Sequence, residues 1–123
     1  MTEQRVIIEM GTGTDLHGQD YTKAAIRAVE DAIRHASLPL FQSLGIDHQA
    51  MRVSVTVGVA APDAVALDRV AAELPRGRVE VRAVAGGLDV VNPETGEVTV
   101  VATAAVEAFL PAQIGWRLAS GED

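Results

Sequence analysis

The fold is decided by residues 6–36, which read VIIEMGTGTDLHGQDYTKAAIRAVEDAIRHA. The first three residues, Val6–Ile8, form a β-branched run of the kind that buried strands use. A polar loop with three glycines follows this run, and an apolar stripe at helical spacing comes after the loop. The stretch therefore predicts a buried strand, a loop and an amphipathic helix, in that order.

The predicted helix begins beside Asp20, whose carboxylate can accept the free backbone N–H groups of a first helical turn. Its apolar stripe consists of Ile26, Val29, Ile33, Ala36 and Leu40. The pairs Arg27–Asp31 and Glu30–Arg34 have opposite charges at four-residue spacing and are predicted to lie on the other side of the helix. Pro39 opposes regular continuation of the helix, so we expect a ragged C-terminal end.

The rest of the chain alternates between strand and helix patterns. Residues 51–59 (MRVSVTVGV) place valines at every second position, which predicts a strand with one core face. A second helix is expected after Pro62-Asp63, with its apolar stripe at Leu67, Val70, Ala71 and Leu74. Further strands are predicted at residues 78–84 and 97–109, and between them a short extended run at 88–91 precedes a turn at 92–96.

This order of elements, β-α-β-α-β-β, predicts an α/β (α+β) sandwich. We expect a mixed four-stranded sheet with two helices packed on one face. At 123 residues the chain predicts a single domain over residues 1–123, with an ordered core from about residue 5 to residue 110 and a flexible C-terminal tail.

Composition excludes several classes of function. The formal net charge of −7, with no basic run, argues against a nucleic-acid surface. The absence of cysteine excludes disulfides and thiolate metal sites. The first residues, MTEQR, carry no apolar signal segment, and no stretch approaches the roughly 20 apolar residues of a membrane span. We therefore expect a cytoplasmic protein with no membrane partner.

The candidate site is the glycine-rich strand-to-helix loop from Gly11 to Lys23. Its glycines allow close approach of the backbone to a ligand, and a helix N-terminus favours an anionic group. The predicted ligand-binding residues are Gly11, Thr12, Gly13, Asp15 and Asp20. His17 is predicted as a catalytic acid or base, because an imidazole titrates near neutral pH, and Lys23 as a charged catalytic partner.

Two other interpretations of the same loop stay open. Asp15, His17 and Asp20 are residue types that bind divalent ions, but their spacing matches no standard metal motif. We therefore expect no metal and no other cofactor. In the structural interpretation, Asp15 forms a local turn, His17 makes local contacts and Asp20 only caps the helix.

The segments IEMGTGTDLHGQDYTKAAIRAVEDAIRHASLP, MRVSVTVGV and GRVEVRAVAGGL resemble a small family of uncharacterised bacterial proteins over nearly the whole chain. The most specific part of this resemblance is DLHGQDYTKAA. Residues 11–23 are also distantly similar to one repeat unit of the ring-opening amidohydrolases, cyanuric acid hydrolase and barbiturase. Those enzymes fuse three such units around a threefold axis in the Toblerone fold. This chain departs from them, because Thr12 and Val57 stand where the enzymes have a lysine and a serine.

These observations lead to two hypotheses of function. The first is an oligomeric protein with a site for a small polar or heterocyclic molecule at this loop and a subunit interface. One form of this hypothesis is an amidohydrolase-like enzyme lacking the Ser-Lys pair. The second is a non-catalytic oligomeric binding or scaffold protein. A homotrimer is expected in either case, because the strand face carrying Ser54, Thr56 and Gly58 is small and smooth, and because the resemblance to the fused enzymes implies threefold symmetry.

Overall fold

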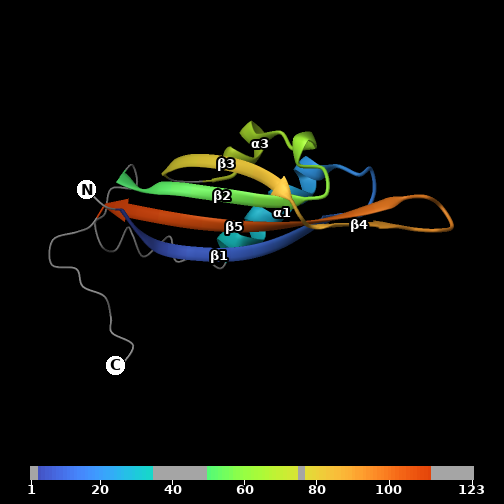
Figure 1. Cartoon of the computed structure of the whole chain (residues 1–123), viewed down its shortest axis with the longest axis horizontal. Coiled ribbons are helices and arrows are strands. Elements are labelled where there is room, and N and C mark those ends of the chain that lie inside the picture. The colour runs from blue at the N-terminus through green and yellow to red at the C-terminus, as the bar shows by residue number, and fades with distance from the viewer. Residues whose placement is uncertain (1–2, 35–49, 75–76, 112–123) are drawn as a thin grey trace, which may run out of the picture.

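The computed structural model describes residues 3–34, 50–74 and 77–111. The predicted flexible tail, the connector at residues 41–49 and the end of the first helix near Leu40 lie outside these residues. The elements follow one another as β1 (Glu3–Asp15), α1 (Tyr21–Arg34), β2 (Arg52–Val59), the 3-10 helix η2 (Pro62–Ala64), α3 (Leu67–Ala71), β3 (Arg78–Ala85), β4 (Leu88–Val91) and β5 (Val98–Pro111) (Figure 1).

The five strands form one mixed sheet in the order β1-β5-β2-β3, and β4 pairs with β5 outside this path. β5 runs antiparallel to β1, β2 and β4, whereas β2 and β3 are parallel. The prediction of four strands was wrong because the short extended run at residues 88–91 was not counted as a strand. The first residues of β5 extend past β2 and pair with this run, which becomes a fifth strand of the sheet.

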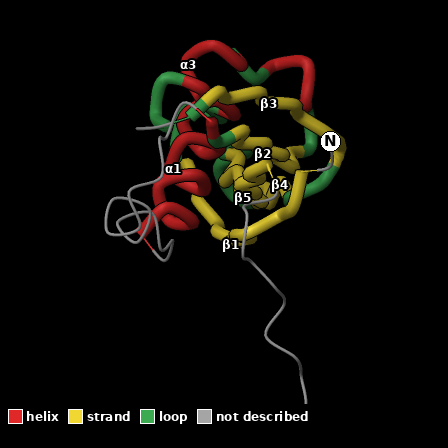
Figure 2. The backbone as a smooth tube through the Cα atoms, turned by 90° about the vertical axis from the view of Figure 1, so that its left-hand side faces the viewer, coloured by secondary structure: helices red, strands yellow, loops and turns green. Residues whose placement is uncertain are grey.

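Helices cover one face of the sheet. Figure 2 shows α1 lying along this side, and α3 lies beyond it near β3. The buried side chains of β2 and β5 point toward the helices, and the predicted burial of Val53, Val55, Val57 and Val59 is confirmed. No helix within the described ranges is long and apolar enough to cross a membrane.

The contact between β1 and α1 is unusually close. A Cβ atom at Gly11 would lie 2.3 Å from the carbonyl oxygen of Ala28. A Cβ atom at Gly13 would lie 2.3 Å from the backbone nitrogen of Ala28. Facing these glycines, α1 buries mostly small side chains: Thr22, Ala24, Ala25, Ala28, Val29 and Ala32. The predicted stripe is confirmed in part: Val29 is fully buried, whereas Ile26 and Ile33 are partly buried and pack at the margins of the core.

The same contact corrects the position of two predicted site residues. Gly11 and Gly13 are not in a loop but in β1, buried beneath α1. Thr12 lies between them on the opposite, exposed side of the strand. The connection between β1 and α1 consists of residues 16–20, which is shorter than the sequence indicated.

The other face of the sheet, here called the open face, has no helix over it in the part of the chain that the structure describes. Toward β4 it exposes Val84, Leu88 and Val90, here called the apolar end, whereas toward the opposite end it carries charged residues in internal ion pairs. Two further exposed apolar residues of this face, Ile8 and Met10, lie on β1 away from β4, and Ile8 is opposite Glu107. The two ends of the open face therefore differ sharply in polarity.

Candidate functional site

The connection from β1 to α1 is a tight turn stabilised by its own backbone. Gly18 has a φ angle of 92°, as expected for a glycine that frees the loop for positive φ, and Gln19 follows with a φ angle of 52°. A positive φ is uncommon for a residue with a side chain. These two residues reverse the chain so that Asp20 lies at the start of α1.

Asp15 is the centre of this region. Its side chain ends β1 on the helix side and the residue is only 3% exposed. One carboxylate oxygen accepts the backbone N–H of Asp20 at 2.9 Å. The other lies 4.0 Å from the ammonium of Lys23 and 3.7 Å from the guanidinium of Arg27. A buried carboxylate is costly unless it is paired, so these contacts explain how Asp15 is tolerated here.

Asp20 caps α1 as the sequence predicts. Its Oδ1 accepts the backbone N–H of Lys23 at 3.0 Å, and its carbonyl oxygen accepts the N–H of Ala24 at 3.1 Å. The first of these bonds satisfies one of the orphan N–H groups of the first turn. The carboxylate of Asp20 is thus committed, at least in part, to the helix.

Two cations lie over this buried carboxylate. The side chains of Lys23 and Arg27 are each about half exposed, and Arg27 also donates to the carbonyl oxygen of Thr14 at 2.6 Å. The carboxylates of Asp15 and Asp20 balance these two positive charges, and the N-terminus of α1 adds a partial positive charge. An anionic group approaching from solvent would meet these side chains first.

His17 has a different partner. Its Nδ1 lies 2.9 Å from a carboxylate oxygen of Glu97, which comes from the turn before β5, and both side chains are mostly exposed. The ammonium of Lys23, in contrast, faces Asp15. The two predicted catalytic side chains therefore belong to separate pairs. A histidine beside a carboxylate can exchange a proton, but here the pair is open to solvent.

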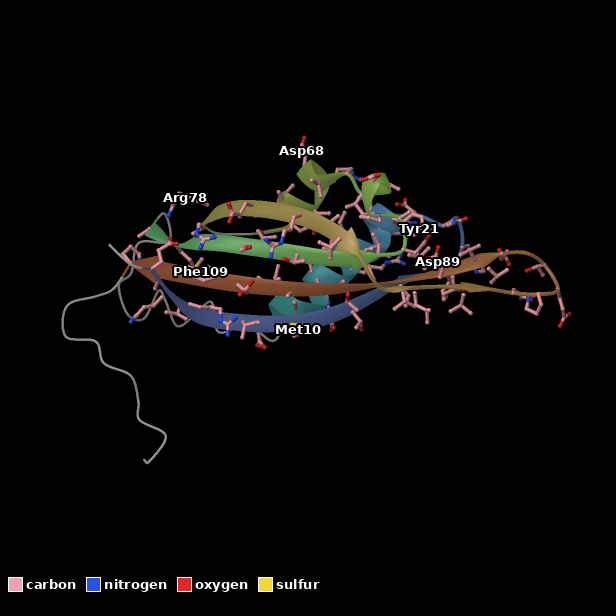
Figure 3. All side chains as sticks on the ribbon, viewed as in Figure 1. Met10, Tyr21, Asp68, Arg78, Asp89 and Phe109 are labelled. Atoms are coloured by element: carbon pink, nitrogen blue, oxygen red, sulfur yellow. The ribbon has the colours of Figure 1, made fainter. Side chains whose placement is uncertain are left out.

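Sequence reasoning missed a contact between the start of α1 and β4. The hydroxyl of Tyr21 donates to Asp89, and Gln19 donates to the Tyr21 oxygen at 3.0 Å. Figure 3 shows Tyr21 and Asp89 close together where β4 begins. The hydrogen bond to Asp89 raises the pKa of Tyr21 above its ordinary value of 10.0. The other oxygen of Asp89 is buried with no hydrogen-bond partner among the described residues.

The remaining predicted site residue, Thr12, contributes its backbone to a structural contact. Its N–H donates to Asp31 of α1 at 3.0 Å. Asp31 also pairs with Arg34 at 3.3 Å, a spacing of three residues. Within the described ranges, no three His, Asp or Glu side chains are grouped so that they could hold a metal ion.

The fold has a close counterpart among solved structures. A crystal structure of an FtsZ-like protein of unknown function from Nostoc punctiforme PCC 73102 has 38% sequence identity to this chain and superimposes with a TM-score of 0.79. The match covers 91% of this chain and 99% of the other. No curated protein matches the chain significantly.

A family model supplies the classification. The model described as "conserved hypothetical protein (Lin0512_fam)" matches residues 5–108, which is most of the chain. This confirms the resemblance to a family of uncharacterised bacterial proteins, while the comparisons lend no support to the specific link with cyanuric acid hydrolase. The chain belongs to the conserved hypothetical family Lin0512_fam.

Proposed function

We propose that this chain is a homo-oligomeric protein that binds a small anionic or carbonyl-rich molecule at the N-terminal end of α1. One observation carries the proposal: Lys23 and Arg27 are half exposed and lie 4.0 and 3.7 Å from the buried carboxylate of Asp15. The carboxylate holds both cations at the end of the helix where free N–H groups and the helix dipole also favour negative charge. Lys23 is the residue we expect to matter most for binding.

The assembly part of the proposal rests on the open face of the sheet. Monomeric proteins rarely expose large continuous apolar patches, and such patches mark interaction sites. The apolar end of the open face adjoins β4, and β4 is tied to α1 by Tyr21 and Asp89. A subunit covering that end would lie near the proposed binding site. The trimeric state rests on the resemblance to enzymes that fuse three similar units.

Catalysis at this site would require more than the binding proposed above. An amidohydrolase-like reaction would need a nucleophile, and the two positions that supply the Ser-Lys pair in the ring-opening enzymes hold other residues. Thr12 is exposed on β1, and Val57 is fully buried in the core. The groups left for acid–base work are His17 and Lys23, so any reaction here would differ in mechanism from that of those enzymes.

A second candidate function is a non-catalytic scaffold. It is favoured by the internal hydrogen bonds of the loop, because Asp15 and Asp20 each accept a backbone N–H and His17 pairs with Glu97. In that case these polar side chains are structural and no small molecule binds to them.

A ligand-shift melting experiment separates the two. The parent chain is screened with carboxylates, inorganic phosphate, heterocyclic imides and divalent cations, and each compound that raises Tm is titrated against variants. We expect an anion or imide to stabilise the parent and Lys23→Ala to weaken its binding at least tenfold with little change in the unliganded Tm. Arg34→Ala is the matched control, because it removes a cation from the other end of α1.

Asp20→Asn gives a second test. Asn caps a helix about as well as Asp, so the Tm of the unliganded protein should hardly change. A loss of binding in this variant would assign the carboxylate to the ligand. Unchanged affinity in Lys23→Ala, Asp20→Asn and His17→Ala, or no stabilising compound in the screen, would favour the scaffold.

A further inference from the structure

The hairpin formed by β4 and the first part of β5, residues 88–101 and here called the arm, extends past the helical layer. Leu88–Val91 pairs with Val98–Val101, and Figure 1 shows this pair reaching beyond α1. At its base the arm is held by the hydrogen bond between Tyr21 and Asp89, and nearer its tip by the pair of His17 with Glu97. The arm is thus fixed in direction by two contacts.

The arm exposes apolar side chains that the rest of the described chain does not cover. Leu88 is 58% exposed, Val90 48% and Val91 58%. Successive side chains of a strand point to opposite faces, so Leu88 and Val90 belong to the open face and Val91 to the helix side. Leu88 is level with Val101, another open-face residue of β5. The apolar end of the open face therefore continues onto the arm.

The outer edge of β4 is protected against pairing with another strand. Natural edge strands are commonly protected by being very short, by lysine or proline, or by inward-pointing charged residues. In the sequence Leu88-Asp89-Val90-Val91, the only charged side chain turns inward to Tyr21. Since β4 is also only four residues long, a partner is expected to contact the faces of the arm and not the backbone of its outer edge.

Charge indicates which partner fits. The tip of the arm is acidic: Glu94 lies in the turn, and Glu97 beside the turn pairs with His17 of the same chain. The opposite end of the open face, here called the arginine end, holds Arg5, Arg52, Arg78 and Arg82 among Glu3, Glu80 and Glu107. Arginines exceed glutamates there by one, although the whole chain has a net charge of −7. Figure 3 shows Arg78 and Phe109 at this end, far from the arm.

The arginine end also offers room. A groove of about 250 Å³ lies along β2 and β3 and is lined by Ser54, Val55, Glu80, Val81 and Arg82. The molecule therefore displays an apolar arm with an acidic tip and an apolar face that leads to a grooved, arginine-bearing end. The two surfaces complement each other in polarity and charge, yet they lie at opposite ends of one chain.

We infer that the arm of one copy of this chain packs on the open face of a second copy, with Leu88 and Val90 against its apolar end and the acidic tip toward its arginine end. This inference rests on the self-association in the proposed function and names the surface responsible for it. It assigns the two neighbouring residues Val90 and Val91 opposite roles, because only Val90 faces the interface.

The test compares single charges on the two faces of the arm. Mass is measured by light scattering after size exclusion at micromolar concentration for the parent, Val90→Asp and Val91→Asp. The parent and Val91→Asp are expected to be oligomeric, and Val90→Asp is expected to fall toward the monomer mass of 12.9 kDa. Circular dichroism confirms that each variant is folded, which is expected because both side chains are about half exposed.

The outcomes separate this inference from the proposed function. A monomeric parent would overturn both. An oligomeric parent that stays assembled in Val90→Asp, or that dissociates equally in Val91→Asp, would overturn the arm contact and leave self-association in place. If Val90→Asp is unfolded, Val90→Ser provides the same comparison with a smaller change.

Charge reversal tests the orientation of the arm. Glu94→Arg and the double variant Arg78→Glu/Arg82→Glu should each weaken assembly. On dilution, each variant should therefore dissociate at a higher protein concentration than the parent does. Combining all three substitutions in one chain restores opposite charges between copies and should recover the parent's assembly. Failure of the combined variant to recover would contradict contact between the tip and the arginine end.

Discussion

Tyr21 joins two segments that are far apart in the sequence. Its hydroxyl donates to Asp89, which lies 68 residues further along the chain, and this bond links the start of α1 to β4. No local pattern marks either residue, because a tyrosine after a helix cap and an aspartate in a short strand are each unremarkable alone. Asp20, in contrast, was predictable as a cap, since its role depends only on residues of the next turn.

The pKa of Tyr21 offers a direct check on this contact. The hydrogen bond to Asp89 raises it above 10.0 by favouring the protonated phenol. Tyr21 is the only tyrosine of the chain, so ultraviolet absorbance during an alkaline titration reports its ionisation. We expect a midpoint above pH 10 in the parent and a lower one in Asp89→Ala.

The same shift fixes the direction of a stability change. The pKa of Tyr21 is higher in the folded than in the unfolded protein. The stabilisation that its hydrogen bond to Asp89 gives the folded protein is therefore fully present below about pH 10, and it is lost as pH rises through the pKa of the folded protein. Asp68→Ala, which removes an exposed carboxylate on α3, is the control and should leave the titration unchanged. An equal midpoint in the parent and Asp89→Ala would show that the bond does not form in solution.

At the scale of the elements, the alternation of valines with other residues predicted β2 well. The glycines of β1, in contrast, led to a wrong prediction of where that strand ends. The valines of β2 recur at every second position and all are buried. In β1 the apolar run stops near Ile8, and the glycines after it suggested a loop. The strand continues because those glycines let α1 approach closely, so that small residues form the core where large ones were expected.

Substitution of Gly11 tests this close packing. A methyl group at Gly11 would lie 2.3 Å from a carbonyl oxygen of α1 and 2.5 Å from a backbone nitrogen, so the helix must shift. We expect Gly11→Ala to lower the free energy of unfolding by about 1–3 kcal/mol, the range for overpacked cores. Chemical denaturation followed by circular dichroism measures the change.

Thr12→Ala is the matched control for that experiment. Thr12 is adjacent but exposed, and its contact with Asp31 uses the backbone N–H, which alanine keeps. Its unfolding free energy should change by less than about 0.5 kcal/mol. Equal stabilities of Gly11→Ala and the parent would mean that α1 does not press on β1.

At the scale of the whole molecule, the sequence predicted the fold class, the covered face of the sheet and the turn at residues 92–96, but not that the run at 88–91 is a fifth strand of the sheet. The length of β5 and its pairing with β4 depend on long-range registration, which local alternation does not encode. The predicted residues Asp15, Asp20 and Lys23 do lie together at the N-terminal end of α1. However, the pairing of Lys23 and Arg27 over Asp15 depended on knowing that β1 extends to Asp15.

The account requires that copies of this chain cover the apolar part of the open face. Its most direct test is the absolute mass of the unmodified protein in solution, measured by light scattering over a range of micromolar concentrations. We predict a mass that is a multiple of 12.9 kDa, three times that value for the proposed trimer. A mass of 12.9 kDa at every concentration would contradict the account.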